Sequence, residues 1–372
     1  MPDAVETKAD EPKFLFDPYL DWIAREGIPV VEDFGIDLKK IETKPWARFG
    51  VPGAAAHLKG RGDFISIFVL DLPPGGKCEP QRHLYEEVVY VLEGHGSTTI
   101  ETADGRKHSF EWGPMSLFAL PLNARYQHFN ASGRERARLS CTNSLGMTMN
   151  LFHNEDFIFK NPYVFAERQG KASHFSGEGD FIPKRPGRHM WETNFVPDLG
   201  QFELKAWSQR GAGGSNMMFV LADGTMHAHI SEMPVGTYKK AHRHGADFHV
   251  FCVTGQGYSL LWYDLDKDLV RVDWEHGVVF APPDAMFHQH FNTSPVPARY
   301  LAVAFGGLRY PMTAAKRAIF LGMDVSVTEG GAQIEYEHQD HRIHQWYLDD
   351  LKKHGAGSKM AQFIDETKYK VS

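Results

Sequence analysis

Residues 118–130 read FALPLNARYQHFN, and residues 280–292 read FAPPDAMFHQHFN. The two stretches align without a gap at an offset of 162 residues. Upstream, Trp112 falls on Trp274 at the same offset, and residues 91–96 (VLEGHG) fall on residues 252–257 (CVTGQG). Similarity that recurs over such a span indicates a repeated structural unit. We therefore predict a duplication, in which each copy can be interpreted against the other.

Both copies carry the pattern of short β-strands. Residues 88–92 and 250–253 are β-branched and aromatic runs that end at a Gly-x-Gly, and residues 97–100 and 258–262 follow as the return strands of hairpins. Turn residues separate these runs at regular spacing, which is typical of an all-β sandwich or barrel.

The composition narrows the class of partner. The chain has 372 residues, with 42% hydrophobic and 23% charged residues, as in an ordinary globular protein. Its net charge of −7 argues against nucleic acid or an anionic membrane as partner, because phosphate binding needs a basic face. No apolar run approaches the ~20 residues that span a bilayer, and the acidic first residues differ from a signal peptide. We expect a cytoplasmic protein that acts on a small molecule.

A histidine cluster in the second copy has the spacing of a metal site. His242 and His244 form an H-x-H pair, which on a strand places both rings on one face. His288 follows the Pro282-Pro283 turn, where a partner strand would begin. Three neutral imidazoles suit Fe(II), Zn, Ni or Cu, and they leave coordination positions for a substrate and for O₂ or water. The three cysteines show no C-x-x-C spacing, so a thiolate zinc site is not expected.

These residues resemble the two motifs of the cupin family. Gly236, His242, His244 and Gly255 match the first motif, and Gly277, Pro283, His288 and Asn292 match the second. The resemblance covers roughly residues 65–150 and 216–305, so the chain is similar to the bicupins. It implies two tandem double-stranded β-helix (jelly-roll) barrels with short flanking helices, and a divalent metal in the second barrel.

The departures from the motifs are informative. Ala285 stands where the second motif has glycine, and the glutamate ligand of the first motif falls on Phe248 or His249. The absence of that carboxylate resembles gentisate 1,2-dioxygenase and its relatives, in which three histidines hold Fe(II). His249 is a candidate fourth ligand if its strand carries a bulge, and in a regular strand it would point to the other face. His290 shares strand parity with His288 and is a candidate for orienting a ligand or the substrate.

The first copy has lost ligands at the corresponding positions. Gln81, His83, Glu87 and Tyr126 align with the metal positions of the second copy, and His128 aligns with His290. We interpret this barrel as degenerate. The alternative is a weak site built from Gln81, His83, Glu87 and His128.

The remaining segments complete the expected organisation. We predict an N-terminal arm (1–60) with one helix at 18–26, a first barrel (61–160), a linker (161–215), a second barrel (216–310) and a C-terminal arm (311–372) with helices at 314–321 and 344–353. Arms of this kind often cover a neighbouring subunit, so we expect a homo-oligomer.

The resemblance leaves several functions open. The leading hypothesis is an Fe(II) dioxygenase that cleaves a ring or a C–C bond of a small hydroxylated aromatic or keto acid, with O₂ as co-substrate. The first alternative is a non-redox lyase, isomerase or decarboxylase on Mn, Zn, Ni or Cu, and the second is a bicupin that binds a small molecule without catalysis. Lys239, Lys240 and Arg243 are candidate carboxylate binders by proximity. The aromatic residues near the motifs are more often core than pocket wall: Phe248, Phe251, Trp262, Phe287 and Phe291.

Overall fold

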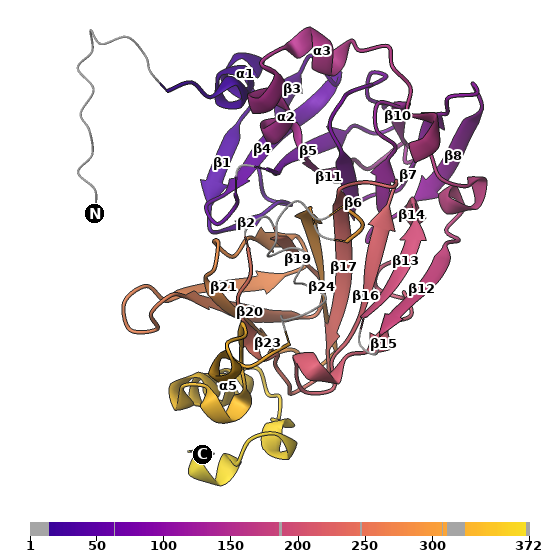
Figure 1. The fold of residues 1–372 in the computed structure, drawn as a ribbon. Helices are drawn as coiled ribbons and strands as arrows, with labels where there is room; N and C mark the ends of the chain where they lie inside the picture. The colour runs from indigo at the N-terminus through magenta and orange to yellow at the C-terminus, as the bar shows by residue number, and fades with distance from the viewer. Residues whose placement is uncertain are drawn as a thin grey trace, which may run out of the picture.

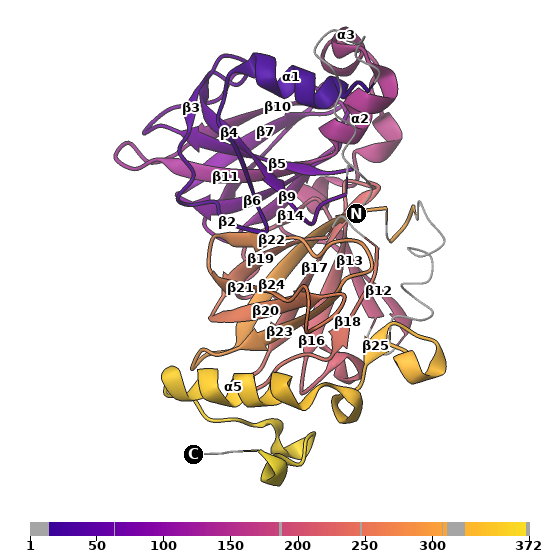
Figure 2. The ribbon, with the colours of Figure 1, turned by 90° about the vertical axis from the view of Figure 1, so that its left-hand side faces the viewer.

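The computed structural model describes residues 15–62, 64–185, 188–245, 248–306, 308–310 and 324–369. Strands dominate, and they form two barrels stacked one on the other, with the N-terminal half of the chain in one and the C-terminal half in the other (Figures 1 and 2). Each barrel combines a large sheet with a smaller one. This confirms the predicted fold class, two tandem jelly-roll barrels with short helices at the periphery, which is the fold of a bicupin.

In the first barrel, the large sheet of the described residues runs in the order β1 (Val30–Asp33), β4 (Val51–Leu58), β5 (Ser66–Leu72), β11 (Ala137–Asn143), β6 (Glu87–Glu93), β9 (Leu117–Leu120) and β14 (Phe195–Val196), with β3 (Lys44–Trp46) paired to β4. The small sheet has the order β10 (Arg125–Asn130), β7 (Gly96–Glu101) and β8 (Lys107–Trp112). Side chains from both sheets, such as Val89, Ile100 and Phe110, share one apolar core.

The second barrel repeats this plan with additional strands. Its large sheet, over the described residues, runs in the order β12 (Asp180–Arg185), β13 (Arg188–Thr193), β16 (Ser215–Leu221), β17 (Met226–Met233), β24 (Ala298–Phe305), β19 (Phe248–Thr254), β22 (Val278–Phe280) and β2 (Gly35–Asp37), with β15 (Lys205–Ala206) paired to β16. The small sheet has the order β21 (Val270–Glu275), β20 (Gln256–Trp262), β23 (Phe287–Asn292), β18 (Ala241–His242) and β25 (Gln333–Ile334).

The repeat seen in the sequence recurs in the hydrogen bonds. Asn130 Nδ2 donates to the carbonyls of Leu72, Pro73 and Glu135, and Asn292 Nδ2 donates to those of Met233, Pro234 and Val296. The two asparagines tie together the same pair of loops in each barrel. The glycines that close the hairpins are also equivalent in the two barrels. A Cβ on Gly96 or Gly257 would lie 2.1 or 1.9 Å from the carbonyl oxygen of the facing strand, so only glycine fits at either position.

The barrels pack through the outer faces of their large sheets. One buried cluster contains Val69 and Leu117 from the first barrel together with Phe219, Phe251 and Leu301 from the second. Two short strands also cross between the halves, since β2 pairs with β22 and β14 pairs with β9. These exchanges fix the two barrels as one unit.

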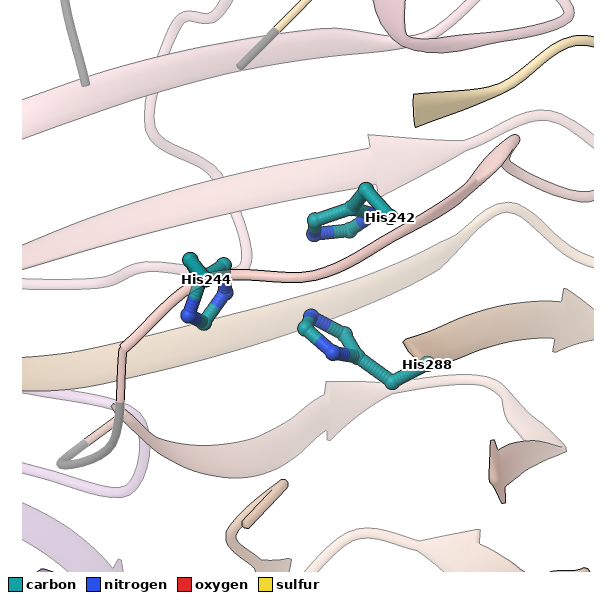
Figure 3. Close-up of side chains that lie close together, drawn as sticks. All are labelled: His242, His244 and His288. Atoms are coloured by element: carbon teal, nitrogen blue, oxygen red, sulfur yellow. The ribbon is translucent and has the colours of Figure 1, made fainter. Parts of the chain in front are cut away.

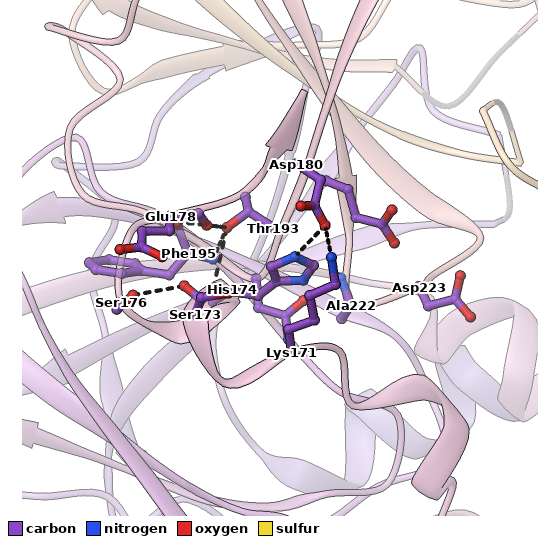
Figure 4. Close-up of polar contacts among 12 residues, drawn as sticks. Lys171, Ser173, His174, Ser176, Glu178, Asp180, Thr193, Phe195, Ala222 and Asp223 are labelled. Atoms are coloured by element: carbon purple, nitrogen blue, oxygen red, sulfur yellow. Dashed lines mark hydrogen bonds and ion pairs between the residues drawn. The ribbon is translucent and has the colours of Figure 1, made fainter. Parts of the chain in front are cut away.

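The segments predicted as an arm and a linker contribute strands to the sheets. Residues 1–60, predicted as an arm with one helix, contribute β1 to β4, and residues 161–215 contribute β12 to β15. Most of these strands are short and attach to the margins of sheets whose central strands come from elsewhere, so they carry little periodic signal of their own. The linker is also held by side chains: Lys171 Nζ and His174 Nε2 lie 2.5 and 3.2 Å from Asp180 Oδ2, and Thr193 Oγ1 donates to the Glu178 carbonyl (Figure 4).

The helices lie at the periphery. α1 spans Pro18–Glu26 as predicted, with Asp17 as N-cap, and it packs on the first barrel near α2 (Leu145–Phe152) and α3 (Glu155–Phe159). α5 spans His341–Lys353, so it begins three residues before the predicted helix, at the Asp340 N-cap, and it covers the small sheet of the second barrel (Figure 2). The helix expected at 314–321 lies outside the described residues. Among the helices described, none has the length and apolar character to cross a membrane.

Candidate metal centre

Three histidines meet inside the second barrel. β18 pairs antiparallel with β23, and this register places His242 directly opposite His288. His244 follows two residues after His242, and its ring turns toward the same point (Figure 3). The ring centroids are 4.1 Å apart for His242 and His288, 4.6 Å for His244 and His288, and 5.5 Å for His242 and His244. One ring nitrogen from each lies within 4.8 Å of the other two, a spacing that one metal ion can bridge.

Backbone carbonyls determine the tautomer of these imidazoles. The Nδ1 atoms of His242, His244 and His288 lie 3.3, 2.8 and 3.2 Å from the carbonyl oxygens of Lys240, Gly245 and Met286. A carbonyl can only accept, so each Nδ1 carries the proton and each Nε2 keeps its lone pair. This is the arrangement by which proteins orient a metal-binding imidazole.

Burial keeps His242 and His288 neutral. It holds the pKa of His242 well below its usual range, and Arg210 and the neighbouring histidines act in the same direction. Burial likewise lowers the pKa of His288 to about 3. Neutral imidazole is the form that ligates metals, so the donor set fits a divalent ion.

His249, the candidate fourth ligand, lies elsewhere. The ladder between β19 and β24 is regular from Phe248 to Cys252, and its bulge comes only after Cys252. Phe248 and Val250 therefore line the cavity around the three histidines, whereas His249 points to the opposite face, toward the first barrel. The bulge that would have brought His249 to the metal is absent at this position.

His290 lines the cavity beside the three histidines. Its ring centroid lies 5.6 Å from that of His288 and 4.8 Å from that of Tyr300, and its Nδ1 is 2.8 Å from Ser259 Oγ. Burial and the nearby positive groups, including Lys239 and Arg210, hold its pKa well below the usual range. The structure thus places His290 next to the cluster, where the candidate orienting role requires it.

The cavity also contains a buried cation, Arg210, that was not predicted from the sequence. Arg210 ends the 3₁₀ helix Ser208–Arg210, is only 3% exposed, and lines the cavity together with His242, His244 and His288. Its Nη1 donates to Gln333 Oε1 over 3.2 Å, and the charge of Asp324 acts on it as well. Arg210 lies in the segment predicted to be a linker, without a motif around it, so no local pattern identifies it.

His227 and His229 were also missed, although the sequence holds a signal for them. They form a second H-x-H pair on β17, and both side chains line the cavity from the large sheet. The parity argument that brought His242 and His244 together would have found this pair.

The cations expected from proximity have other positions. Lys240 forms an ion pair with Glu335, and Arg243 is exposed, with its guanidinium 4.8 Å from the centre of the Phe287 ring. Lys239 is buried, 5.6 Å from the Trp207 ring and 5.2 Å from the Tyr300 ring. The described lining of the cavity includes none of the three.

Among the five aromatic residues named from the sequence, only Phe248 lines the cavity. Phe251 belongs to the core between the barrels, and Trp262, Phe287 and Phe291 pack beneath α5. The expectation that most of them are core residues is confirmed.

The first barrel holds a hydrogen-bonded chain in place of the cluster. His83 Nε2 lies 3.0 Å from the Tyr126 hydroxyl, which in turn lies 3.2 Å from Glu87 Oε1. Gln81 points away and donates to the carbonyls of Arg48 and Glu79. His128 binds Thr98 Oγ1 through Nδ1. The phenol of Tyr126 thus stands between His83 and Glu87, which fits the interpretation of this barrel as degenerate.

Comparisons with known proteins assign no family to the chain. No family model matches the chain, and no curated protein matches it. Among solved structures, the formate complex of Lactobacillus farciminis oxalate decarboxylase is 14% identical, with a TM-score of 0.49 over 78% of this chain and 91% of that one. Bacillus subtilis oxalate decarboxylase, studied for its Mn(II) centres, is 15% identical, with a TM-score of 0.46 over 74% and 78% of the two chains. Likeness at this level carries no information about the substrate.

Proposed function

We propose that the protein is a metal-dependent enzyme whose active site lies in the second barrel and which acts on a small carboxylic acid by non-redox chemistry. In this proposal His242, His244 and His288 hold a divalent ion, and Arg210 binds a carboxylate of the substrate. The observation that carries it is the buried guanidinium of Arg210 in the same cavity as the three imidazoles. An arginine fork matches the geometry of a carboxylate and binds it through two hydrogen bonds.

The ligand set supports Lewis-acid chemistry. A bound divalent ion would polarise a substrate oxygen and leave coordination positions free. Since all three candidate ligands are neutral, none of them would offset the charge of the ion. Imidazole donors suit Fe(II), Zn, Ni and Cu, and Mn remains in the panel of metals to be tested.

The lining of the cavity favours decarboxylation or a related lyase reaction. Its described residues include Arg210 and several histidines but no Asp or Glu that could serve as a carboxylate base. Loss of CO₂ breaks a C–C bond and leaves the electron pair on the substrate, where nearby positive groups stabilise it as an enolate. No proton has to be abstracted in that step, and a proton is taken up afterwards.

An Fe(II) dioxygenase is the second candidate, and the absence of a carboxylate from the ligand cluster favours it. Three neutral imidazoles leave positions for both O₂ and a bidentate substrate. In that case oxygen is consumed with the substrate, whereas the non-redox reaction proceeds equally well without oxygen. A bicupin that only binds the acid would consume neither the acid nor oxygen.

The test is a panel of 2-oxo, 2-hydroxy and dicarboxylic acids and hydroxybenzoates, with CO₂ release and O₂ uptake measured in parallel on protein loaded with each metal. The proposal predicts turnover of a small acid without O₂ uptake. It also predicts a loss of at least tenfold in kcat/KM for Arg210→Met, from a lost charge-assisted pair, and no loss for the matched control Arg243→Met. O₂ uptake in step with substrate loss would replace the proposal by the dioxygenase, and equal effects of the two arginine variants would remove Arg210 from the site.

A further inference from the structure

A chain of two hydrogen bonds reaches His290 from the side away from the cavity. Trp274 Nε1 donates to Ser259 Oγ over 3.0 Å, and Ser259 Oγ lies 2.8 Å from His290 Nδ1. All three side chains are buried, with Ser259 on β20 and His290 on β23, its neighbour in the small sheet. Because these groups are buried, losing one of these hydrogen bonds would leave a polar atom without a partner, which costs free energy.

These two hydrogen bonds determine which nitrogen of His290 carries the proton. An indole N–H can only donate, so Ser259 Oγ is the acceptor of the first bond. The single hydroxyl hydrogen of Ser259 then needs an acceptor, and among the described residues His290 Nδ1 is the partner within reach. A buried hydroxyl avoids being left without a partner, so Nδ1 accepts. The proton of the neutral ring therefore lies on Nε2.

We propose that Trp274 and Ser259 hold His290 as its Nε2–H tautomer, and that this N–H donates a hydrogen bond to the substrate. Only the second half rests on the proposed function, since the tautomer follows from the protein alone. His290 lines the cavity with Arg210 and the three candidate ligands. With its proton on Nε2 it is a hydrogen-bond donor and not a fourth ligand. It is positioned to stabilise the oxygen that gains negative charge, and Ser259 and Trp274 are positioning residues.

The first barrel contains the same chain of hydrogen bonds, and there it ends at a histidine whose Nε2 is buried. Trp112 Nε1 donates to Thr98 Oγ1 over 2.9 Å, and Thr98 Oγ1 lies 2.7 Å from His128 Nδ1. His128 Nε2 is buried and has no hydrogen-bond partner among the described residues. The duplication thus kept the chain in both barrels, and in the second barrel it ends among the candidate metal ligands. Because threonine takes the role of Ser259 in the first barrel, Ser259→Thr is a matched control.

Neutron diffraction from crystals of the perdeuterated full-length protein tests the tautomer directly. The expected result is deuterium on His290 Nε2 and none on Nδ1. Deuterium on Nδ1 would overturn the proposal. This measurement needs neither a substrate nor a bound metal, so it holds or fails independently of the proposed function.

Binding and kinetics test the donor role. With oxalate, malonate and pyruvate as probes on metal-loaded protein, we expect Ser259→Ala to weaken carboxylate binding about tenfold and Ser259→Thr to match the wild type. His290→Phe should lower kcat on the turned-over acid by on the order of a hundredfold at unchanged metal content. Loss of metal in His290→Phe would make His290 a ligand and refute the proposal, as would identical affinities of the Ala and Thr variants. If the wild type binds none of the probes, the proposed function and the donor role fail together, while the neutron result decides the tautomer.

Discussion

The protonation state of the buried carboxyl group of Glu87 tests the hydrogen-bonded chain described in the first barrel. The side chain is 2% exposed, and its Oε2 has no hydrogen-bond partner among the described residues. Its Oε1 faces the Tyr126 hydroxyl, which also faces His83 Nε2. Since His83 Nδ1 donates to the Tyr85 carbonyl, the single phenolic proton has two acceptors to serve. A protonated Glu87 supplies the missing hydrogen, and burial raises its pKa from the ordinary 4.5 to about 8.

The sign and size of the effect follow from linkage. The folded state holds this proton more tightly than the unfolded state does, so the stabilisation is complete below pH 4.5 and is lost as the pH rises toward 8. A pKa unit corresponds to about 1.4 kcal/mol, so the loss reaches at most about 5 kcal/mol. Glu87→Gln keeps the shape of the side chain and cannot ionise. Part of this loss occurs below pH 5 and part above pH 8, so the variant should gain about 3.5 kcal/mol of stability relative to the wild type between pH 5 and pH 8.

Urea denaturation of wild type and variant at both pH values measures the difference, and comparing the two proteins cancels every other titrating group. The exposed Glu79 on the same barrel provides the control, since Glu79→Gln should shift stability little at either pH. A constant difference between Glu87→Gln and wild type from pH 5 to pH 8 would show that Glu87 is not protonated in the folded protein, and the account of the first barrel would be wrong.

Three further substitutions test the fold. Ala285 has a φ of 56°, and its N–H donates to the His244 carbonyl. Ala285→Gly should relieve the left-handed strain and stabilise the protein by up to about 1 kcal/mol in urea denaturation. A destabilised variant would contradict this. Asn292→Ala removes three hydrogen bonds to loop carbonyls, and Asn130→Ala removes the equivalent three. Each should lower the unfolding free energy by about 2–3 kcal/mol, and a large effect for one barrel with none for the other would refute the equivalence of the repeats.

The sequence was most informative where structure is set locally. Strand parity and the spacing of the Pro-Pro turn predicted that His242, His244 and His288 share one site, because the side chains of a strand alternate. The internal repeat predicted two barrels, since the same hairpin glycines and the same asparagine recur. Helix α1 begins at its predicted residue, after the Asp17 N-cap, whereas α5 begins three residues before its predicted start, after the Asp340 N-cap. The cytoplasmic location and the homo-oligomer stay predictions.

The parts that could not be predicted depend on contacts between distant segments. Arg210 enters the cavity from a segment without periodicity, and Gln333, more than 120 residues away, holds its guanidinium. The face to which His249 points depends on the position of one β-bulge, which lies beyond Cys252. The strands at the sheet margins, such as β2 and β14, are determined by their partners in the opposite half of the chain. Such features follow from how the sheets close, which a linear pattern does not contain.

Metal content is the most direct test of the central claim. Purified wild type, His244→Ala and His83→Ala would be analysed by inductively coupled plasma mass spectrometry after equilibration with each candidate divalent metal. We expect about one tightly bound ion per chain in the wild type, as three imidazoles in one cluster imply. We also expect that His244→Ala loses the ion and that His83→Ala keeps it. Retention of the ion in His244→Ala, or its loss in His83→Ala, would place the metal outside the second barrel and contradict the account.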